Sequence, residues 1–277
     1  MSDKKVSIMS FNIMNGWGNN SDYAPPAFRE KWVARIVNEQ NPDLIGFQET
    51  SDCCIVWENE LNKDLCENGA YDYRALSQEE DFKLKKMTTG AGLIIMWKKD
   101  RFELKDSGCF EYTPFSRQVR YYQWVKLYDK VYDKNIVMTN THLSIDSDSK
   151  PKGEEFTAAD GHAVRNIQAG ELFGFWKENV TGEAALFATG DYNSLLTEMD
   201  HTTFQQDGLF MPSCNIAEVY DEKSLIDFCY TSPATVGVDE VKTLAYLFRD
   251  DIKIQDLPDT FYRASDHNPV MTWAYYK

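Results

Sequence analysis

Apolar residues come in short runs along this chain, and turn residues bound most of the runs. The runs are rich in Val, Ile, Phe, Tyr and Trp, which is typical of β-strands. We therefore predict strands at 6–14, 43–49, 71–76, 91–98, 121–129, 135–143, 185–191, 225–231 and 270–275.

Stretches with helical periodicity separate several of these runs, and helices are predicted at 27–39, 53–65, 155–178 and 198–206. In the first of them one apolar stripe is formed by Trp32, Val33, Ile36 and Val37. Runs such as "GLIIMW" are apolar at consecutive positions, so we expect further layers to cover both faces of the sheets. No repeat or Pro/Gly-rich linker interrupts the alternation, which predicts a single domain over 1–277.

The composition narrows the class of protein. No segment approaches the roughly 20 apolar residues that span a bilayer, and we expect no membrane insertion. The net charge of −15 argues against a protein that coats nucleic acid with lysine and arginine, although a local basic groove can coexist with an acidic remainder. The polar residues Ser7, Ser10 and Asn12 interrupt the N-terminal apolar stretch, which favours a first strand over a signal peptide.

The six cysteines show no CxxC spacing, so neither a disulfide scaffold nor a zinc site is expected. Cys53 and Cys54 are adjacent and are expected to be reduced, which favours the cytoplasm and leaves a secreted mature form open. A monomer is expected.

Residues of catalytic type interrupt or end several predicted strands: Asn12, Glu49, Asn140, His142, Asp191, Asn193, Asp227, Asp266 and His267. Each has an ordinary explanation, because polar residues also cap turns and end strands in solvent. Asp227 is the exception, since it stands between Ile226 and Phe228 and a buried charge must be paired.

As a set, these residues indicate a reaction centre. Two of only four histidines, His142 and His267, belong to it, and its carboxylates can orient an imidazole or hold a hard cation. Oxygen ligands suit Mg²⁺ better than zinc, and Mn²⁺ is not distinguished from Mg²⁺. His162 and His201 lie in helical stretches and are expected to be surface or packing residues.

The motifs "MSFNIMNG", "PDLIGFQET", "NTHL", "GDYNS", "LIDFCYTS" and "SDHNPV" occur in the order seen in one superfamily. From Ser10 to Val270 the chain resembles the endonuclease/exonuclease/phosphatase superfamily, which contains deoxyribonuclease I. The resemblance implies an α/β fold, a four-layer α/β sandwich with two mixed β-sheets packed face to face and helices on the outer faces. It also implies hydrolysis of phosphoesters at the edges of the sheets.

The resemblance suggests a role for each matched residue. Glu49 resembles the principal Mg²⁺ ligand, helped by Asn12 and Asp266. His267 resembles the histidine that acts on the attacking water or on a phosphoryl oxygen, and Asp227 resembles the carboxylate that orients it.

The other matched positions surround the phosphate. Asp191 and Asn193 resemble the pair that positions the nucleophile and stabilises the pentacovalent phosphorus, with Asn193 also contacting the phosphate. His142 matches the second histidine of the deoxyribonuclease and sphingomyelinase branches. Arg120 resembles a phosphate-binding arginine, and Arg117 is a rival for that role.

Three functions stay open at this level. The first is a Mg²⁺-dependent nuclease-like phosphodiesterase, for which the basic run at Lys83, Lys85 and Lys86 is either a backbone contact or a solvated loop. The second is a phosphatase or phosphodiesterase of a small or lipid phosphoester, such as an inositol phosphate or a sphingomyelin-like head group. The acidic composition supports this second function, and the lack of a membrane-inserting apolar hairpin counts against its lipid form. The third is a catalytically inactive binding module.

In "RYYQW" we expect the aromatic residues to be strand core.

Overall fold

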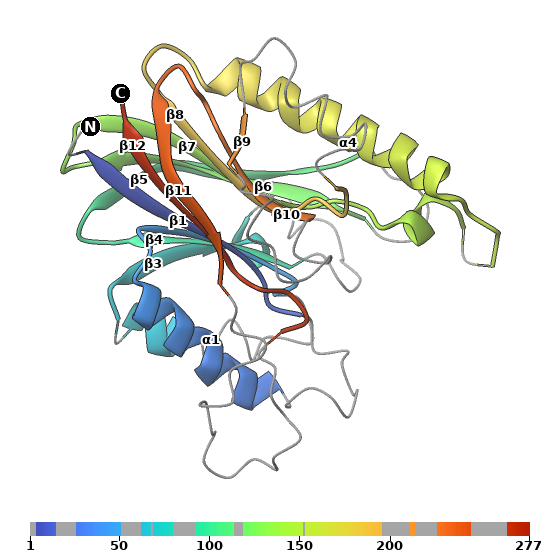
Figure 1. The fold of residues 1–277 in the computed structure, drawn as a ribbon, viewed down its shortest axis with the longest axis horizontal. Coiled ribbons are helices and arrows are strands. Elements are labelled where there is room, and N and C mark those ends of the chain that lie inside the picture. Colours follow the sequence, from blue (N-terminus) through green and yellow to red (C-terminus); the bar gives the residue numbers. More distant parts are fainter. Residues whose placement is uncertain are drawn as a thin grey trace.

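The structure is a computed structural model of the chain, and it describes residues 4–14, 26–50, 62–67, 69–79, 92–113, 119–151, 153–195, 211–213, 226–244 and 265–277. Two six-stranded sheets form its centre (Figure 1). In spatial order the first sheet contains β11 (Val236–Thr243), β12 (Val270–Tyr276), β1 (Lys5–Asn12), β2 (Leu44–Gln48), β4 (Leu93–Lys98) and β3 (Tyr71–Ala75). The second contains β5 (Phe102–Glu111), β6 (Tyr121–Asp129), β7 (Lys134–His142), β8 (Ala185–Asp191), β10 (Asp227–Thr231) and β9 (Met211–Ser213).

Both sheets are mixed. Strand β1 pairs in parallel with β2, and β7 pairs in parallel with β8, whereas the other pairs are antiparallel. Parallel neighbours end at the same edge of a sheet. The carboxyl ends of β1 and β2 therefore lie together, as do those of β7 and β8.

One helix covers the outer face of each sheet (Figure 1). Helix α1 (Pro26–Gln40) packs its predicted stripe, including Trp32 and Val33, against the outward side chains of the first sheet. Helix α4 (Ala158–Asn179) packs Leu172 and Trp176 against the second sheet. A third apolar cluster fills the space between the sheets. The four-layer sandwich is thus confirmed.

Helix α4 begins three residues later than predicted because Thr157 caps it. The Thr157 backbone amide donates to the Asp160 carboxylate, and the Asp160 backbone amide donates to the Thr157 hydroxyl, which together form a capping box. On this helix His162 is partly exposed and has its Nδ1 3.2 Å from Nη2 of Arg165, which agrees with the expectation of a surface or packing residue. His201 and the predicted helix 198–206 lie outside the described residues.

Three strands were not predicted: β5, β9 and β11. Strands β5 and β11 are edge strands with exposed charged side chains, including Glu103 on β5 and Glu240 on β11. Charges on an edge strand discourage pairing with other chains, but they also hide the apolar pattern of a strand. Of the predicted helix 53–65, only the end is described, and it belongs to a π-helical turn, Asn62–Glu67.

No described helix is both long and apolar enough to cross a bilayer.

The side chains that fill the space between the sheets change from apolar to polar along the strands. At one end it is apolar, with Val6, Leu44 and Ile136 among its residues. Further along, amide side chains connect the two sheets. Asn140 on β7 donates to the carbonyl oxygens of Phe47 (2.7 Å) and Ile94 (3.2 Å), and its own oxygen accepts from Gln48. Asn140, a candidate reactive residue in the sequence, therefore joins the sheets.

Candidate active site

Beyond this polar layer, the side chains that point between the sheets belong to residues at the ends of the strands. The predicted site residues lie there. Strand β7 ends at His142 and β8 ends at Asp191, and these two residues are register partners. Asp191 is also the register partner of Asp227, the first residue of β10. Three of the predicted residues are therefore neighbours on one sheet.

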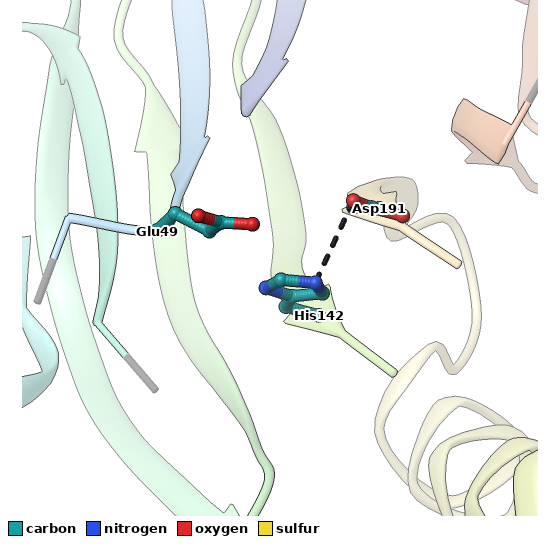
Figure 2. A group of neighbouring side chains, drawn as sticks. All are labelled: Glu49, His142 and Asp191. Carbon is teal, nitrogen blue, oxygen red and sulfur yellow. Dashed lines mark ion pairs between the residues drawn. The ribbon is translucent and has the colours of Figure 1, made fainter. Parts of the chain in front are cut away.

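Glu49 reaches this group from the opposite sheet through a backbone bend. The side chain of Gln48 points between the sheets, so simple alternation would direct Glu49 outward. Glu49 instead has a φ of 57°, in the left-handed region, and Asn193 beyond β8 has a φ of 48°. Non-glycine residues adopt this conformation rarely, and such residues cluster at functional sites. Figure 2 shows the Glu49 carboxylate pointing toward His142 and Asp191.

Asn12 joins the carboxylates of the two sheets. Its Nδ2 donates to Oε1 of Glu49 (3.1 Å) and to Oδ2 of Asp191 (2.8 Å). Its Oδ1 accepts from the backbone amide of Met14. In this arrangement Asn12 orients two carboxylates with its NH₂ group, while its oxygen is engaged by the backbone.

His267 forms a close pair with Asp227. The Nδ1 of His267 lies 2.7 Å from Oδ2 of Asp227, and its Nε2 lies 3.8 Å from Oδ2 of Asp191 and 4.0 Å from Oδ1 of Asp266. Burial opposes the charged imidazole, but the three carboxylates outweigh it and raise the pKa of His267 well above its ordinary value.

Ser265 fixes the backbone of this segment. Its hydroxyl donates to the carbonyl oxygen of Asn12 (2.7 Å) and accepts from the backbone amide of His267 (3.2 Å). The C-terminal motif is thereby tied to the end of β1.

His142 occupies the other side of Asp191, with its Nε2 3.5 Å from Oδ2 of Asp191. Burial and the nearby positive charge of Arg120 lower the pKa of His142. Burial would raise the pKa of Asp191, but His142, His267 and the bond from Asn12 outweigh it and lower that pKa. Asp191 is therefore a charged carboxylate between two imidazoles.

The donor set fits a divalent cation. Ligand atoms of Glu49, His142 and Asp191 lie within 4.8 Å of one another, and so do those of Asp191, Asp227 and His267. Oδ1 of Asp227 is buried and has no hydrogen-bond partner among the described residues. Several buried carboxylates at one place need compensating positive charge, and oxygen-rich sets suit hard cations.

The sequence model described as "Endonuclease/Exonuclease/phosphatase family" matches residues 9–267, nearly the whole chain. The chain belongs to this family. Members of the endonuclease/exonuclease/phosphatase family are hydrolases that act on phosphoesters, which sets the reaction class.

Solved structures share the fold of this family member. An endonuclease/exonuclease/phosphatase family protein from Bacteroides thetaiotaomicron has a TM-score of 0.75 at 19% identity, with 100% of both chains covered. The mannosyl-6-phosphatase Bt3783 from the same organism has a TM-score of 0.71 at 19% identity, over 96% of this chain and 98% of that one. The catalytic domain of human Nocturnin with bound sulfate has a TM-score of 0.71 at 15% identity, over 99% and 95% of the chains. No curated protein sequence matches this chain significantly.

Most of the site residues expected from the family resemblance lie together. Hydrogen bonds, ion pairs or register link Asn12, Glu49, His142, Asp191, Asn193, Asp227, Asp266 and His267. Asn193 joins through its backbone amide, which donates to Oδ1 of Asp191, while its Nδ2 donates to the carbonyl oxygen of Leu143.

Arg120 lies just outside this group and pairs with Asp148. Its rival Arg117, and the lysines at 83, 85 and 86, lie outside the described residues. Of the aromatic residues in "RYYQW", Tyr121 and Tyr122 are buried, as expected for strand core, whereas Trp124 is only partly buried.

Two residues that contact predicted site residues were missed from the sequence: Ser265, which bonds to Asn12 and His267, and Asp148, which pairs with Arg120. Ser265 stands directly before Asp266-His267, so its place in the motif was a usable signal. Asp148 had none, because it is one of several acidic residues in the mixed-charge segment after β7.

Proposed function

We propose that this protein is a divalent-cation-dependent phosphodiesterase of the nuclease type. The observation that carries the proposal is the His267–Asp227 pair, with Nδ1 and Oδ2 2.7 Å apart, beside the ionised carboxylate of Asp191. Phosphoester hydrolysis needs an oriented water, stabilisation of the phosphoryl oxygens and a path for protons, and these side chains can provide each of them.

Asp227 accepts the Nδ1–H bond of His267 and so fixes the imidazole with Nε2 toward Asp191. The raised pKa of His267 favours the imidazolium, which can donate a hydrogen bond or a proton to a phosphoryl oxygen. Asp191, held ionised by its neighbours, can orient the attacking water and accept its proton, and Asn193 lies beside it. His142 on the far side of Asp191 can stabilise the leaving oxygen.

Glu49 would be the principal ligand of the cation, with Asn12 and Asp266 as helpers. Mg²⁺ or Mn²⁺ bound there would neutralise negative charge on the phosphoryl group. For Asn12 to contribute its oxygen, the bond from the Met14 amide would have to be shared or replaced.

A phosphatase of small phosphoesters is the second candidate. The net charge of −15 disfavours long contacts with a polyanion, and one structural relative is named a mannosyl-6-phosphatase. Other relatives include D. rerio TDP2 complexed with single-strand DNA product, which supports the first candidate.

A substrate panel tests the proposal. Plasmid DNA, single-stranded DNA, RNA, bis-p-nitrophenyl phosphate, inositol phosphates, mannose 6-phosphate and sphingomyelin are each incubated with Mg²⁺, Mn²⁺ or EDTA. We expect cation-dependent cleavage of the diesters, and a loss of roughly 10²–10⁴-fold in His267→Ala. Steep inhibition by salt supports a nucleic-acid substrate. Turnover of monoesters alone would favour the second candidate, and binding without any turnover would indicate an inactive binding module.

A further inference from the structure

Arg120 and Asp148 form a buried ion pair at the edge of the candidate site. Nη2 of Arg120 lies 2.8 Å and Nε 3.3 Å from the same oxygen, Oδ2 of Asp148. The two side chains are only 4% and 3% exposed. Burying two charges costs desolvation energy that such a pair often fails to recover, so stability alone is a weak reason for its presence.

One donor group of Arg120, Nη1, does not bond to Asp148. It is buried and has no hydrogen-bond partner among the described residues. A buried donor on a charged group is costly to leave unpaired. The planar guanidinium presents its N–H groups in a fixed fork that matches phosphate oxygens. A phosphoryl oxygen from outside the protein would satisfy Nη1 while Asp148 keeps Nε and Nη2.

The pair lies next to the reacting groups. Arg120 directly precedes β6, whose residue Tyr122 is the register partner of Thr141, the neighbour of His142. Asp148 belongs to the 3₁₀ turn η3 (Asp146–Ser149), which begins four residues beyond His142. The charge of Arg120 also reaches His142, where it acts after burial to lower the imidazole pKa.

We infer that Asp148 is a positioning residue: it holds the Arg120 guanidinium so that Nη1 contacts a phosphoryl oxygen of the bound substrate. This inference rests on the proposed function and extends it to a residue outside the reacting group. The competing arrangement is a carboxylate that masks Arg120 and competes with phosphate for it. The two arrangements predict opposite effects of removing Asp148.

Inorganic phosphate is the probe, titrated into the 277-residue protein with saturating Mg²⁺ and followed by calorimetry. We expect Arg120→Gln and Asp148→Ala each to weaken phosphate binding about tenfold, the scale of one charge-assisted hydrogen bond. Asp148→Asn, whose amide oxygen still accepts from Nη2, should fall between Asp148→Ala and the wild type. Asp146→Asn is the matched control, because Asp146 lies in the same turn but pairs with Arg165. Its phosphate affinity should equal that of the wild type.

A double variant separates positioning from general damage to the fold. In the Arg120→Gln background, Asp148→Ala should weaken phosphate binding no further. An additive loss would show that Asp148 acts elsewhere, and unchanged or tighter binding in the Asp148 single variants would show that it masks the arginine. If Asp148→Ala does not fold, Asp148→Asn alone decides between weaker and unchanged binding.

Phosphate binding is measured without turnover, so this inference and the proposed function fail separately. Wild-type protein that hydrolyses diesters but shows equal phosphate affinity in every Asp148 variant would overturn the inference alone. Wild-type protein that binds no phosphate would also overturn it, whatever the substrate panel gives. Failure of hydrolysis with intact, Asp148-dependent phosphate binding would overturn only the proposed function.

Discussion

Nδ1 of His267 lies 2.7 Å from Oδ2 of Asp227, although 40 residues separate them in the sequence. The strand β10 and the C-terminal motif meet here, and Asp227 fixes the direction of the imidazole. The role of Asp227 therefore depends on His267, and the two side chains should act as one unit.

Asp227→Asn should lower kcat by roughly 10²–10⁴-fold, because the imidazole loses the acceptor that orients it. In a His267→Ala background the same change should cost little more, since the unit is already broken. Steady-state kinetics on the best substrate of the panel measure both effects. Two independent, multiplying losses would contradict the coupling.

Glu49→Gln should weaken Mg²⁺ binding by at least about tenfold, because even residues that only support metal ligands cost roughly 10–100-fold when changed. Calorimetric titration of Mg²⁺ gives the affinity, and loss of the Mg²⁺-dependent rise in melting temperature confirms it. Glu39→Gln is the control, since Glu39 pairs with Arg35 on the exposed surface of α1. Equal Mg²⁺ affinity in both variants would exclude Glu49 as a ligand.

The metal-free protein should lose stability as the pH rises above 6.5, because the lowered pKa of His142 acts in the opposite direction only below that pH. The pKa of His267 in the folded state lies above its unfolded value of 6.5, so the stabilisation is complete below that pH and is lost as the pH approaches the folded-state pKa. Urea unfolding in EDTA, from about pH 5 to about pH 9, measures this trend. The variant Asp227→Asn/His267→Gln removes the imidazole together with its carboxylate partner and should show a flatter profile. Parallel profiles in the variant and the wild type would contradict the assignment of this trend to His267.

Asn140→Ala should destabilise the fold by about 2–4 kcal/mol, because the carbonyl oxygens of Phe47 and Ile94 lose a donor and Gln48 loses an acceptor. Asn135→Ala, at an exposed position of the same strand, should stay within about 0.5 kcal/mol of the wild type. Urea unfolding gives both values. A small effect at Asn140 would mean that the sheets are held together by apolar packing alone.

Gly46→Ala tests how closely the two sheets approach each other at Gly46. A Cβ at this position would lie 1.8 Å from Oγ1 of Thr189 and 2.8 Å from Oδ1 of Asn140. We expect a loss of about 1–3 kcal/mol or more in the free energy of unfolding. Gly170→Ala in the interior of α4, where a Cβ meets nothing within 4 Å, should instead stabilise by roughly 0.5–1 kcal/mol. Effects of the same sign would contradict this packing.

Alternation along the strands explains why much of the site could be predicted. Asn12, His142, Asp191 and Asp227 occupy inward positions at strand ends, so an apolar run and a reactive residue at its end point to one edge of the sandwich. Glu49 breaks the alternation, and only its motif indicated a role, because the left-handed bend that redirects its side chain cannot be read from periodicity.

Other features depend on contacts that no local pattern contains. In the sequence, Asn140 looks like a reactive residue because it is an amide near the end of an apolar strand. Only its contacts with the opposite sheet show that it joins β7 to β2 and β4. The Arg120–Asp148 pair requires the turn after β7 to fold back over the start of β6. The edge strands β5 and β11 were missed because their exposed charges resemble those of loops.

The register between His142 and Asp191 limits how this chain can change over evolutionary time. Inserting or deleting a single residue within β7 or β8 would turn one of the two side chains to the opposite face and separate the pair. Loops that hold none of the site residues carry no such restriction and can lengthen or shorten. Relatives with new substrate preferences should therefore differ in loop length around an unaltered strand frame.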